Sequence, residues 1–493
     1  MFQCQRARAA RGARLCYHAP MPIRSPVAIV LAVAVACAPK PGAETLDGGS
    51  TSGEATGGDT GEPTGGPTDG WVPPLDCENP GEWSRKFGGP TNDTVQGLAV
   101  DAAGNIYVGL DLRNLGESAP VQFGGFEIVP GELSNIVVLK LSSCGEVLWA
   151  KQFGGPGDQY MWTLTACGDG VVFQAEAEPG TLDLGDGPIS ERVFFAALDG
   201  AGGLRWTHPV PTSSPEAWLL VADMVCDAEG RLAMTGSHEY GSVDLGGGPL
   251  DKDDGFVARF AADGTFLWSR DFGSPSRGFG VAYTPTGDVV VTADVDDTVD
   301  LGGGPLGPDA GGVLLAKLDG TGAHVWSERL GGSGINGPSA LAVDSQGRIT
   351  VGGVFIDEIS LGDQTYTNVF PESVPEVDGT LRDGFLVTTD PDGVLQWSLH
   401  LGSMYDDDVT QLAYDKNDVL IVSGLVDSVF AVRAFVDAQP TWKWSASGLY
   451  QVYAELSGDD AVVLMPWIGY GAAFGDPYDD DPNSDVWVAA ILR

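Results

Sequence analysis

The residues with the clearest chemical potential are acidic, and they recur at one point of a repeated pattern. An Asp-Leu-Gly element occurs at Asp183, Asp244 and Asp300, and further carboxylates cluster within 251–254, 294–297 and 479–485. Hard cations prefer oxygen ligands, so Asp183, Asp244 and Asp300 are candidate ligands of a calcium ion. Repeated Asp-Gly pairs also form turns, and solvated acidic turns are the alternative interpretation.

Other patterns of catalysis or cofactor binding are missing from the sequence. The histidines after residue 37 are His208, His238, His324 and His400, one to a unit of the repeat described below, and no HExxH, GxSxG or CxxC motif occurs. Gly302, Gly304 and Gly307 match GxGxxG, but no βαβ pattern surrounds them. We therefore expect no catalytic residues and no certain cofactor, and we expect each histidine to be a surface residue rather than a ligand.

Tryptophan marks a repeated unit in the chain after residue 82. The repeat tryptophans are Trp83, Trp149, Trp206, Trp268, Trp326, Trp397 and Trp444. Each unit contains short apolar segments, such as Ile106-Tyr107-Val108 and Phe256-Val257-Ala258, separated by turns with Gly, Asp or Asn. Four short strands per unit are typical of a propeller blade. The pattern predicts an all-β fold, a single seven-bladed β-propeller of four-stranded blades.

The two ends of the repeat complement each other. Residues 486–492 match the third strand of the other units, and no fourth strand follows them. Trp83 to Phe87 could supply it, which would remove an open sheet edge. We therefore expect the propeller to be closed by pairing of the N-terminal strand with the C-terminal blade.

The repeat resembles a known family. The motif runs from Phe87-Gly88-Gly89 through Leu98-Ala99-Val100-Asp101 to Asn105-Ile106-Tyr107-Val108, and related motifs continue over essentially all of 82–493. It resembles the SBBP family, the bacterial beta-propeller repeat of secreted and surface proteins. The resemblance implies the propeller fold and an extracytoplasmic setting. Because the family has no agreed reaction, it implies no catalytic residue.

Four cysteines remain in the repeat region and just before it, an even number that permits three complete pairings. Cys167 and Cys226 fall at nearly the same turn of adjacent units, between the first and second strands and close to the expected propeller axis. Neighbouring blades approach closely there, so we expect a Cys167–Cys226 disulfide, and Cys77–Cys144 by elimination. Free buried thiols are the alternative.

The N-terminus indicates export. Arg24 precedes an apolar stretch, Val27 to Ala36, that is too short to span a membrane, and Ala34-Val35-Ala36-Cys37 resembles a lipobox. We expect Met21 to be the true start and Cys37 to be lipidated, with cleavage by an ordinary signal peptidase as the alternative. The predicted divisions are a signal region over 1–37, a disordered Gly/Thr/Pro/acidic tether over 38–76, and the propeller over 77–493.

The net charge of the chain limits the classes of partner that it can bind. A net charge of −42 repels nucleic acid and anionic lipid headgroups, so we expect membrane contact only through the lipid. We expect a monomer in the bacterial cell envelope, anchored to the outer membrane or cell surface, that binds an extracytoplasmic protein or glycan without catalysis. The alternatives are a carbohydrate-active lyase or hydrolase that uses loop acids, and a purely structural envelope component.

Overall fold

The structure is a computed structural model that describes residues 83–87, 92–113, 120–131, 133–250, 254–273, 275–307, 312–331, 335–368, 381–403, 405–426, 429–446, 452–457, 461–466 and 486–492. The predicted signal region, tether and lipidation site at Cys37 lie outside these residues, as does Cys77. The described residues form strands and turns, and none of them is in a helix. Accordingly, the described part of the chain offers no helix with the length and apolar character to cross a membrane.

The described strands pair into seven four-stranded antiparallel sheets. The first three, in spatial order, are sheet 1, with β2 (Asn92–Val100), β3 (Ile106–Arg113), β6 (Ser134–Leu141) and β7 (Val147–Phe153); sheet 2, with β8 (Gln159–Cys167), β9 (Gly170–Ala177), β10 (Val193–Leu198) and β11 (Leu204–Val210); and sheet 3, with β12 (Trp218–Cys226), β13 (Leu232–Glu239), β14 (Gly255–Phe260) and β15 (Phe266–Asp271). The next two are sheet 4, with β16 (Ser276–Tyr283), β17 (Val289–Val295), β18 (Gly312–Leu318) and β19 (His324–Leu330), and sheet 5, with β20 (Ile335–Val343), β21 (Ile349–Ile356), β24 (Asp383–Thr389) and β25 (Leu395–Leu401). The last two are sheet 6, with β26 (Gln411–Tyr414), β27 (Leu420–Val426), β28 (Val429–Val436) and β29 (Gln439–Ala446), and sheet 7, with β30 (Val452–Ser457), β31 (Ala461–Pro466), β32 (Val486–Leu492) and β1 (Trp83–Phe87).

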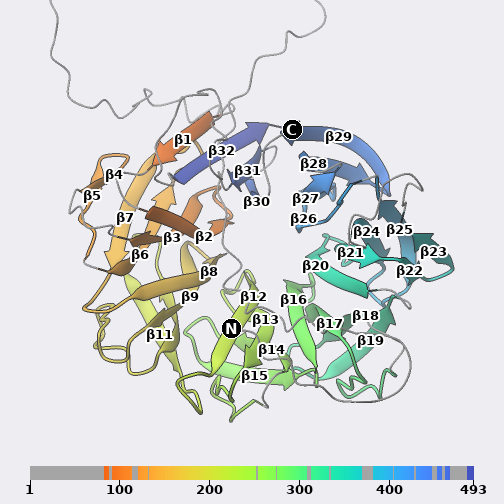
Figure 1. Ribbon diagram of the computed structural model, residues 1–493, viewed down its shortest axis with the longest axis horizontal. Coiled ribbons are helices and arrows are strands. Elements are labelled where there is room, and N and C mark those ends of the chain that lie inside the picture. The colour runs from red at the N-terminus through yellow and green to blue at the C-terminus, as the bar shows by residue number, and fades with distance from the viewer. Residues whose placement is uncertain are drawn as a thin grey trace, which may run out of the picture.

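The sheets follow one another around a common axis (Figure 1). The first strand of each sheet contacts the first strand of the next, from β2 through β8, β12, β16, β20 and β26 to β30. Strand β30 in turn contacts β2. Strand β1, from the start of the described chain, pairs antiparallel with β32, so that Trp83 opposes Ala490 and Phe87 opposes Val486. The first strands therefore lie near the axis and the strands with the repeat tryptophans lie outside.

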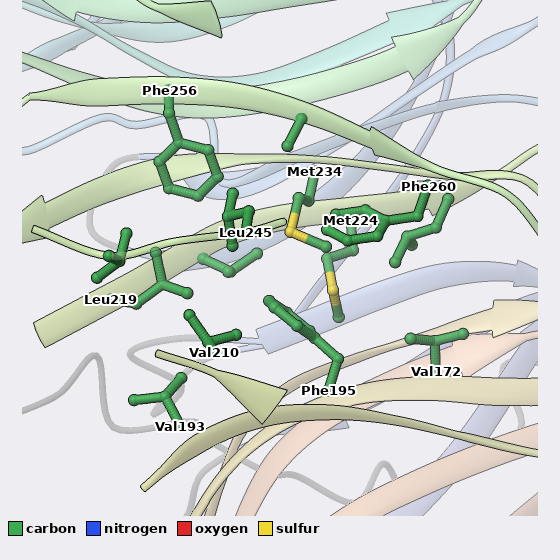
Figure 2. Packing of buried hydrophobic residues seen from close by; sticks show 14 of the residues in the cluster. Val172, Val193, Phe195, Val210, Leu219, Met224, Met234, Leu245, Phe256 and Phe260 are labelled. Atoms are coloured by element: carbon green, nitrogen blue, oxygen red, sulfur yellow. The ribbon is translucent and has the colours of Figure 1, made fainter. Parts of the chain in front are cut away.

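Apolar side chains on these strands alternate between two cores instead of between core and solvent. In β14, Phe256 and Phe260 belong to the core between sheets 2 and 3, while Val257 belongs to the core between sheets 3 and 4. Figure 2 shows Phe195 and Val210 of sheet 2 facing Met234 and other side chains of sheet 3. Each fully buried side chain of this size stabilises the fold by roughly 1.5–3 kcal/mol. This two-sided burial explains why the middle strands read as nearly continuous apolar runs.

Four of the repeat tryptophans connect their sheet to the next one. Trp149 Nε1 donates to the Gly200 carbonyl at 2.9 Å, and Trp326 Nε1 donates to the Pro391 carbonyl at 3.1 Å. Trp206 and Trp268 do the same to Ala262 and Gly320. Each acceptor lies in the turn between the third and fourth strands of the following sheet. The residue that defines the repeat in the sequence is thus an inter-sheet contact.

Two of the longer connections contain hairpins of their own. Strands β4 (Val121–Phe123) and β5 (Phe126–Ile128) pair within sheet 1's connection from β3 to β6. Strands β22 (Glu358–Leu361) and β23 (Gln364–Thr367) pair within sheet 5's connection from β21 to β24. Neither hairpin was predicted from the sequence.

Candidate binding site at the loop end of the sheets

The three aspartates predicted as calcium ligands lie in separate connections and serve as turn acceptors. Oδ1 of Asp183 accepts the backbone N–H groups of Gly185 and Gly187, at 2.8 and 3.1 Å. Oδ1 of Asp244 and of Asp300 accepts the equivalent pairs of glycine N–H groups. Among the described residues, no group of three or more His, Cys, Asp or Glu side chains is placed to hold a metal ion. One carboxylate oxygen of each aspartate is therefore used by its own turn, and calcium binding stays a prediction.

The other acidic clusters fall partly outside the described residues. Asp254 is buried at the start of sheet 3's third strand, while the rest of 251–254 and the whole of 479–485 are not described. Asp294 lies at the end of β17, where burial and the neighbouring Asp296 raise its pKa to about 6 against the opposing effect of Arg277 and Arg329.

A disulfide bond joins two adjacent sheets. Cys167 at the end of β8 and Cys226 at the end of β12 form a disulfide, with their Cα atoms 5.2 Å apart. The disulfide forms where the first strands of neighbouring sheets approach each other, as predicted from the equivalent positions of the two cysteines in adjacent units. Cys144 is also disulfide-bonded, and the partner predicted for it, Cys77, lies outside the described residues.

The histidine expectation is wrong for His238. This residue is fully buried on β13 and packs against Phe256, with 6.5 Å between the ring centroids. A second strand is covered on both faces by neighbouring sheets, so a side chain near its end is not at the surface. His208 is half-buried against Phe260, and its Nε2 lies 3.1 Å from the Leu245 carbonyl. Burial lowers the pKa of His208.

An Asp–His pair appears that sequence reasoning did not find. His400 Nε2 lies 2.7 Å from Asp383 Oδ2, and the His400 ring packs between Phe355 and Tyr366. Asp383 begins β24 and His400 is near the end of β25, so the two are cross-strand neighbours in one corner of sheet 5. Such a pair could orient a general base.

One end of the sheets gathers aromatic and charged side chains from several units. In an antiparallel blade the chain enters the first strand and passes from the second to the third strand at the same end, which we call the loop end. Trp162 near the start of β8 and Trp218 at the start of β12 lie there, in the first strands of sheets 2 and 3. Their ring centroids are 5.9 Å apart with an interplanar angle of 55°, and both residues are half-buried. Two tryptophans of successive sheets thus meet near the axis.

An ion pair flanks each tryptophan. Arg192 Nη1 lies 3.1 Å from Glu176 Oε2 in sheet 2, and Arg192 also donates to the Ala217 carbonyl just before β12. On the other side, Arg277 of β16 lies 3.0 Å from Glu239, the residue that opposes Trp218 across sheet 3. The four charges therefore form two neutral pairs at the loop end of sheets 2, 3 and 4.

The electrostatic state of Glu176 reflects its position between these groups. Burial raises its pKa, while the Arg192 charge and the Trp162 indole N–H oppose that effect. Trp162 Nε1 and Glu176 Oε1 are nevertheless outside hydrogen-bonding geometry, so we treat their contact as electrostatic. The Glu176 side chain is only 12 % exposed, whereas Arg277 on the outer side is 55 % exposed. The site thus has a buried polar side and an accessible one.

Sequence reasoning missed Trp162 and Trp218 because the repeat drew attention to other tryptophans. Both follow a repeat tryptophan of their unit and lie in the next strand, off the repeated position. Their position outside the repeat is the sequence feature that could have identified them, because a tryptophan that does not belong to the repeated motif has some role other than forming the repeat. Nothing in the sequence shows that the two rings meet.

Comparisons with known proteins agree with the repeat. Residues 82–109 match the family model described as "Beta-propeller repeat", SBBP. A curated relative, "Regulatory protein FlaEY" of Caulobacter vibrioides, is 24 % identical over 266 residues, which are 52 % of this chain and 26 % of that protein. The match therefore spans about a quarter of the relative's length.

The solved structures similar to this one have low sequence identity and low TM-scores. Virginiamycin B lyase from Staphylococcus aureus has a TM-score of 0.43 and 7 % identity, with 83 % of this chain and 99 % of that chain covered. Sqt1 from Chaetomium thermophilum has a TM-score of 0.42 and 13 % identity, with 83 % and 100 % covered. The structure titled "YCF48 bound to D1 peptide" has a TM-score of 0.40 and 10 % identity, with 86 % and 100 % covered.

Proposed function

We propose that this protein is a non-enzymatic binding module of the bacterial cell envelope, built as one closed seven-bladed β-propeller. The pairing of β1 with β32 and the contact of β30 with β2 support the closed ring. The lipobox-like Ala34-Val35-Ala36-Cys37 and the tether after it support display on a lipid anchor outside the cytoplasm. The partner is an extracytoplasmic protein or glycan, and the module acts as a monomer.

The observation that carries this proposal is the arrangement of side chains at the loop end. Half-buried Trp162 and Trp218 and the 64 % exposed Tyr240 lie there, in sheets 2 and 3. Tyr240 has a positive φ of 61°, a backbone conformation that is uncommon for a bulky residue. Aromatic side chains with accessible charges beside them are typical of binding surfaces.

A carbohydrate-active enzyme is the second candidate, and the observation in its favour is the Asp383–His400 pair. A carboxylate that orients a histidine is a common arrangement for proton transfer. The pair lies in sheet 5, apart from the tryptophans of sheets 2 and 3. The two candidates therefore use different residues and can be separated.

The test is thermal unfolding of the protein with a panel of envelope polysaccharides and with solubilised envelope proteins, each followed by product analysis. A ligand that binds the folded state stabilises it by RT ln(1 + [L]/Kd), so we expect a raised midpoint without new reducing ends or unsaturated products. Products that appear with the protein and disappear with His400→Ala would establish the enzyme instead. No shift with any ligand would count against a binding module.

A further inference from the structure

The two tryptophans at the loop end present apolar ring surface in a polar setting. Their ring centroids are 5.9 Å apart and the ring planes are tilted by 55°, so the two indoles are not stacked face to face. Indole rings contribute large apolar contact areas at low entropic cost, because only two side-chain torsions must be ordered. Flat apolar rings suit a ligand that has both apolar C–H faces and polar edges.

The flanking groups supply hydrogen-bonding capacity on both sides of the rings. Glu176 and Arg192 lie beside Trp162, and Glu239 and Arg277 lie beside Trp218. Carboxylates accept and guanidinium groups donate several hydrogen bonds in fixed directions, which matches the vicinal hydroxyls of a sugar. A few such polar groups around an apolar surface are what fix a ligand's orientation.

Charge decides between ligand classes. The two acids and two arginines at the site compensate each other, whereas the whole chain has a net charge of −42. The surrounding field repels polyanions, and the arginines are already paired and cannot reverse it. An uncharged ligand approaches this site without that penalty.

We propose that Trp162 and Trp218, with the Glu176–Arg192 and Glu239–Arg277 pairs, form a binding site for an uncharged oligosaccharide. This inference rests on the proposed binding function and specifies its ligand class. The sugar faces pack on the indoles, and the ring hydroxyls exchange hydrogen bonds with Arg192, Glu239 and Arg277, whose side chains are about one-third exposed or more, while buried Glu176 holds Arg192 in place. The site joins sheets 2, 3 and 4, so it requires the assembled ring.

The experiment is isothermal titration of the whole protein with cellohexaose, maltohexaose and chitohexaose, and with alginate as an anionic polysaccharide. We expect at least one neutral hexaose to bind, and alginate not to bind. Trp162→Ala and Trp218→Ala should each weaken that binding about tenfold or more, as expected for buried aromatic anchors. The matched control is Tyr405→Ala, an exposed aromatic residue elsewhere on the loop end, which should leave the affinity unchanged.

Two further variants protect the test from misfolding. Arg277→Met and Glu239→Gln change partly exposed side chains, so both should keep the unfolding midpoint while weakening the neutral sugar. Binding that survives all four substitutions would overturn the site. Binding of alginate or of envelope proteins without any neutral sugar would overturn the ligand class and leave the binding module standing. No binding to anything would refute both.

Discussion

Aspartate recurs in this chain as a turn acceptor. Oδ1 of Asp199, Asp319 and Asp390 accepts backbone N–H groups two and four residues later, in turns between third and fourth strands. Asp227 and Asp344 do the same between first and second strands. Hydrogen bonds from the Asp199 and Asp319 turns lower the pKa of these carboxyl groups. Local turn chemistry therefore accounts for the aspartates that recur at these turns.

A different kind of aspartate joins two sheets. Asp111 near the end of β3 accepts the Met161 backbone N–H of sheet 2 at 2.9 Å and the Gln96 side chain at 2.7 Å. Burial raises its pKa to about 8, because these two hydrogen bonds offset only part of the desolvation.

The pH dependence of stability follows from Asp111. Since its folded-state pKa lies above its ordinary value, the folded state binds more protons between about pH 4 and pH 8, and stability falls as pH rises through that window. Asp111→Asn removes this contribution because an amide does not titrate. The amide oxygen can still accept the Met161 N–H, so the contact between the sheets is kept. We expect the fall in unfolding midpoint between pH 5 and pH 8 to be smaller for the variant. Parallel curves for the two proteins would contradict the assignment.

At the scale of strands and turns, two donors from one sheet converge on one carbonyl of the next. Lys317 Nζ and Trp326 Nε1 both reach the Pro391 carbonyl, at 3.3 and 3.1 Å. Arg259 and Trp268 converge in the same way on the Gly320 carbonyl. A third-strand cation and a fourth-strand tryptophan thus hold the next turn together.

This convergence can be measured with a double-mutant cycle. Trp326→Phe or Lys317→Met alone leaves Pro391 one donor, whereas the double variant leaves none. We expect the double variant to lose about 1 kcal/mol more stability than the sum of the single variants. The control combines Trp326→Phe with Lys140→Met in sheet 1, which should be additive. Additivity in both cycles would show that the two donors act independently.

At the scale of the molecule, the first and last described strands of the chain pair with each other in sheet 7. Strand β1 supplies the outer strand of sheet 7, and every one of its five residues is in register with β32. Without β1, β32 would expose an unpaired edge, which is a template for association with another chain.

Truncation tests this contact. Removing the chain through Phe87 deletes β1, whereas removing it through Gly81 keeps β1 and serves as the control. We expect the shorter protein to unfold at a lower temperature and to associate, because about five residues of pairing are lost and an edge opens. Equal midpoints and equal molar masses by light scattering would show that the ring does not need β1.

The sequence alone determined the local elements and their order. Each unit repeats a tryptophan, an aspartate turn and the short strands around them, as at Trp326 and at the turn with Asp390 that it contacts. The four-stranded unit could therefore be predicted. The placement of Cys167 and Cys226 at equivalent turns was enough to predict their pairing, which is present. These features depend on turn chemistry and spacing, which each unit contains within itself.

Only the tertiary structure decided which side chains meet between strands and between sheets. Trp162 is the extra residue where the pairing of β8 with β9 shifts between Met161 and Thr163, and that bulge sets its direction toward Trp218. The meeting of Asp383 with His400 depends likewise on the register of β24 with β25. Bulges and registers are settled by packing against neighbouring sheets, which lie far away in the sequence, so local patterns do not reveal them.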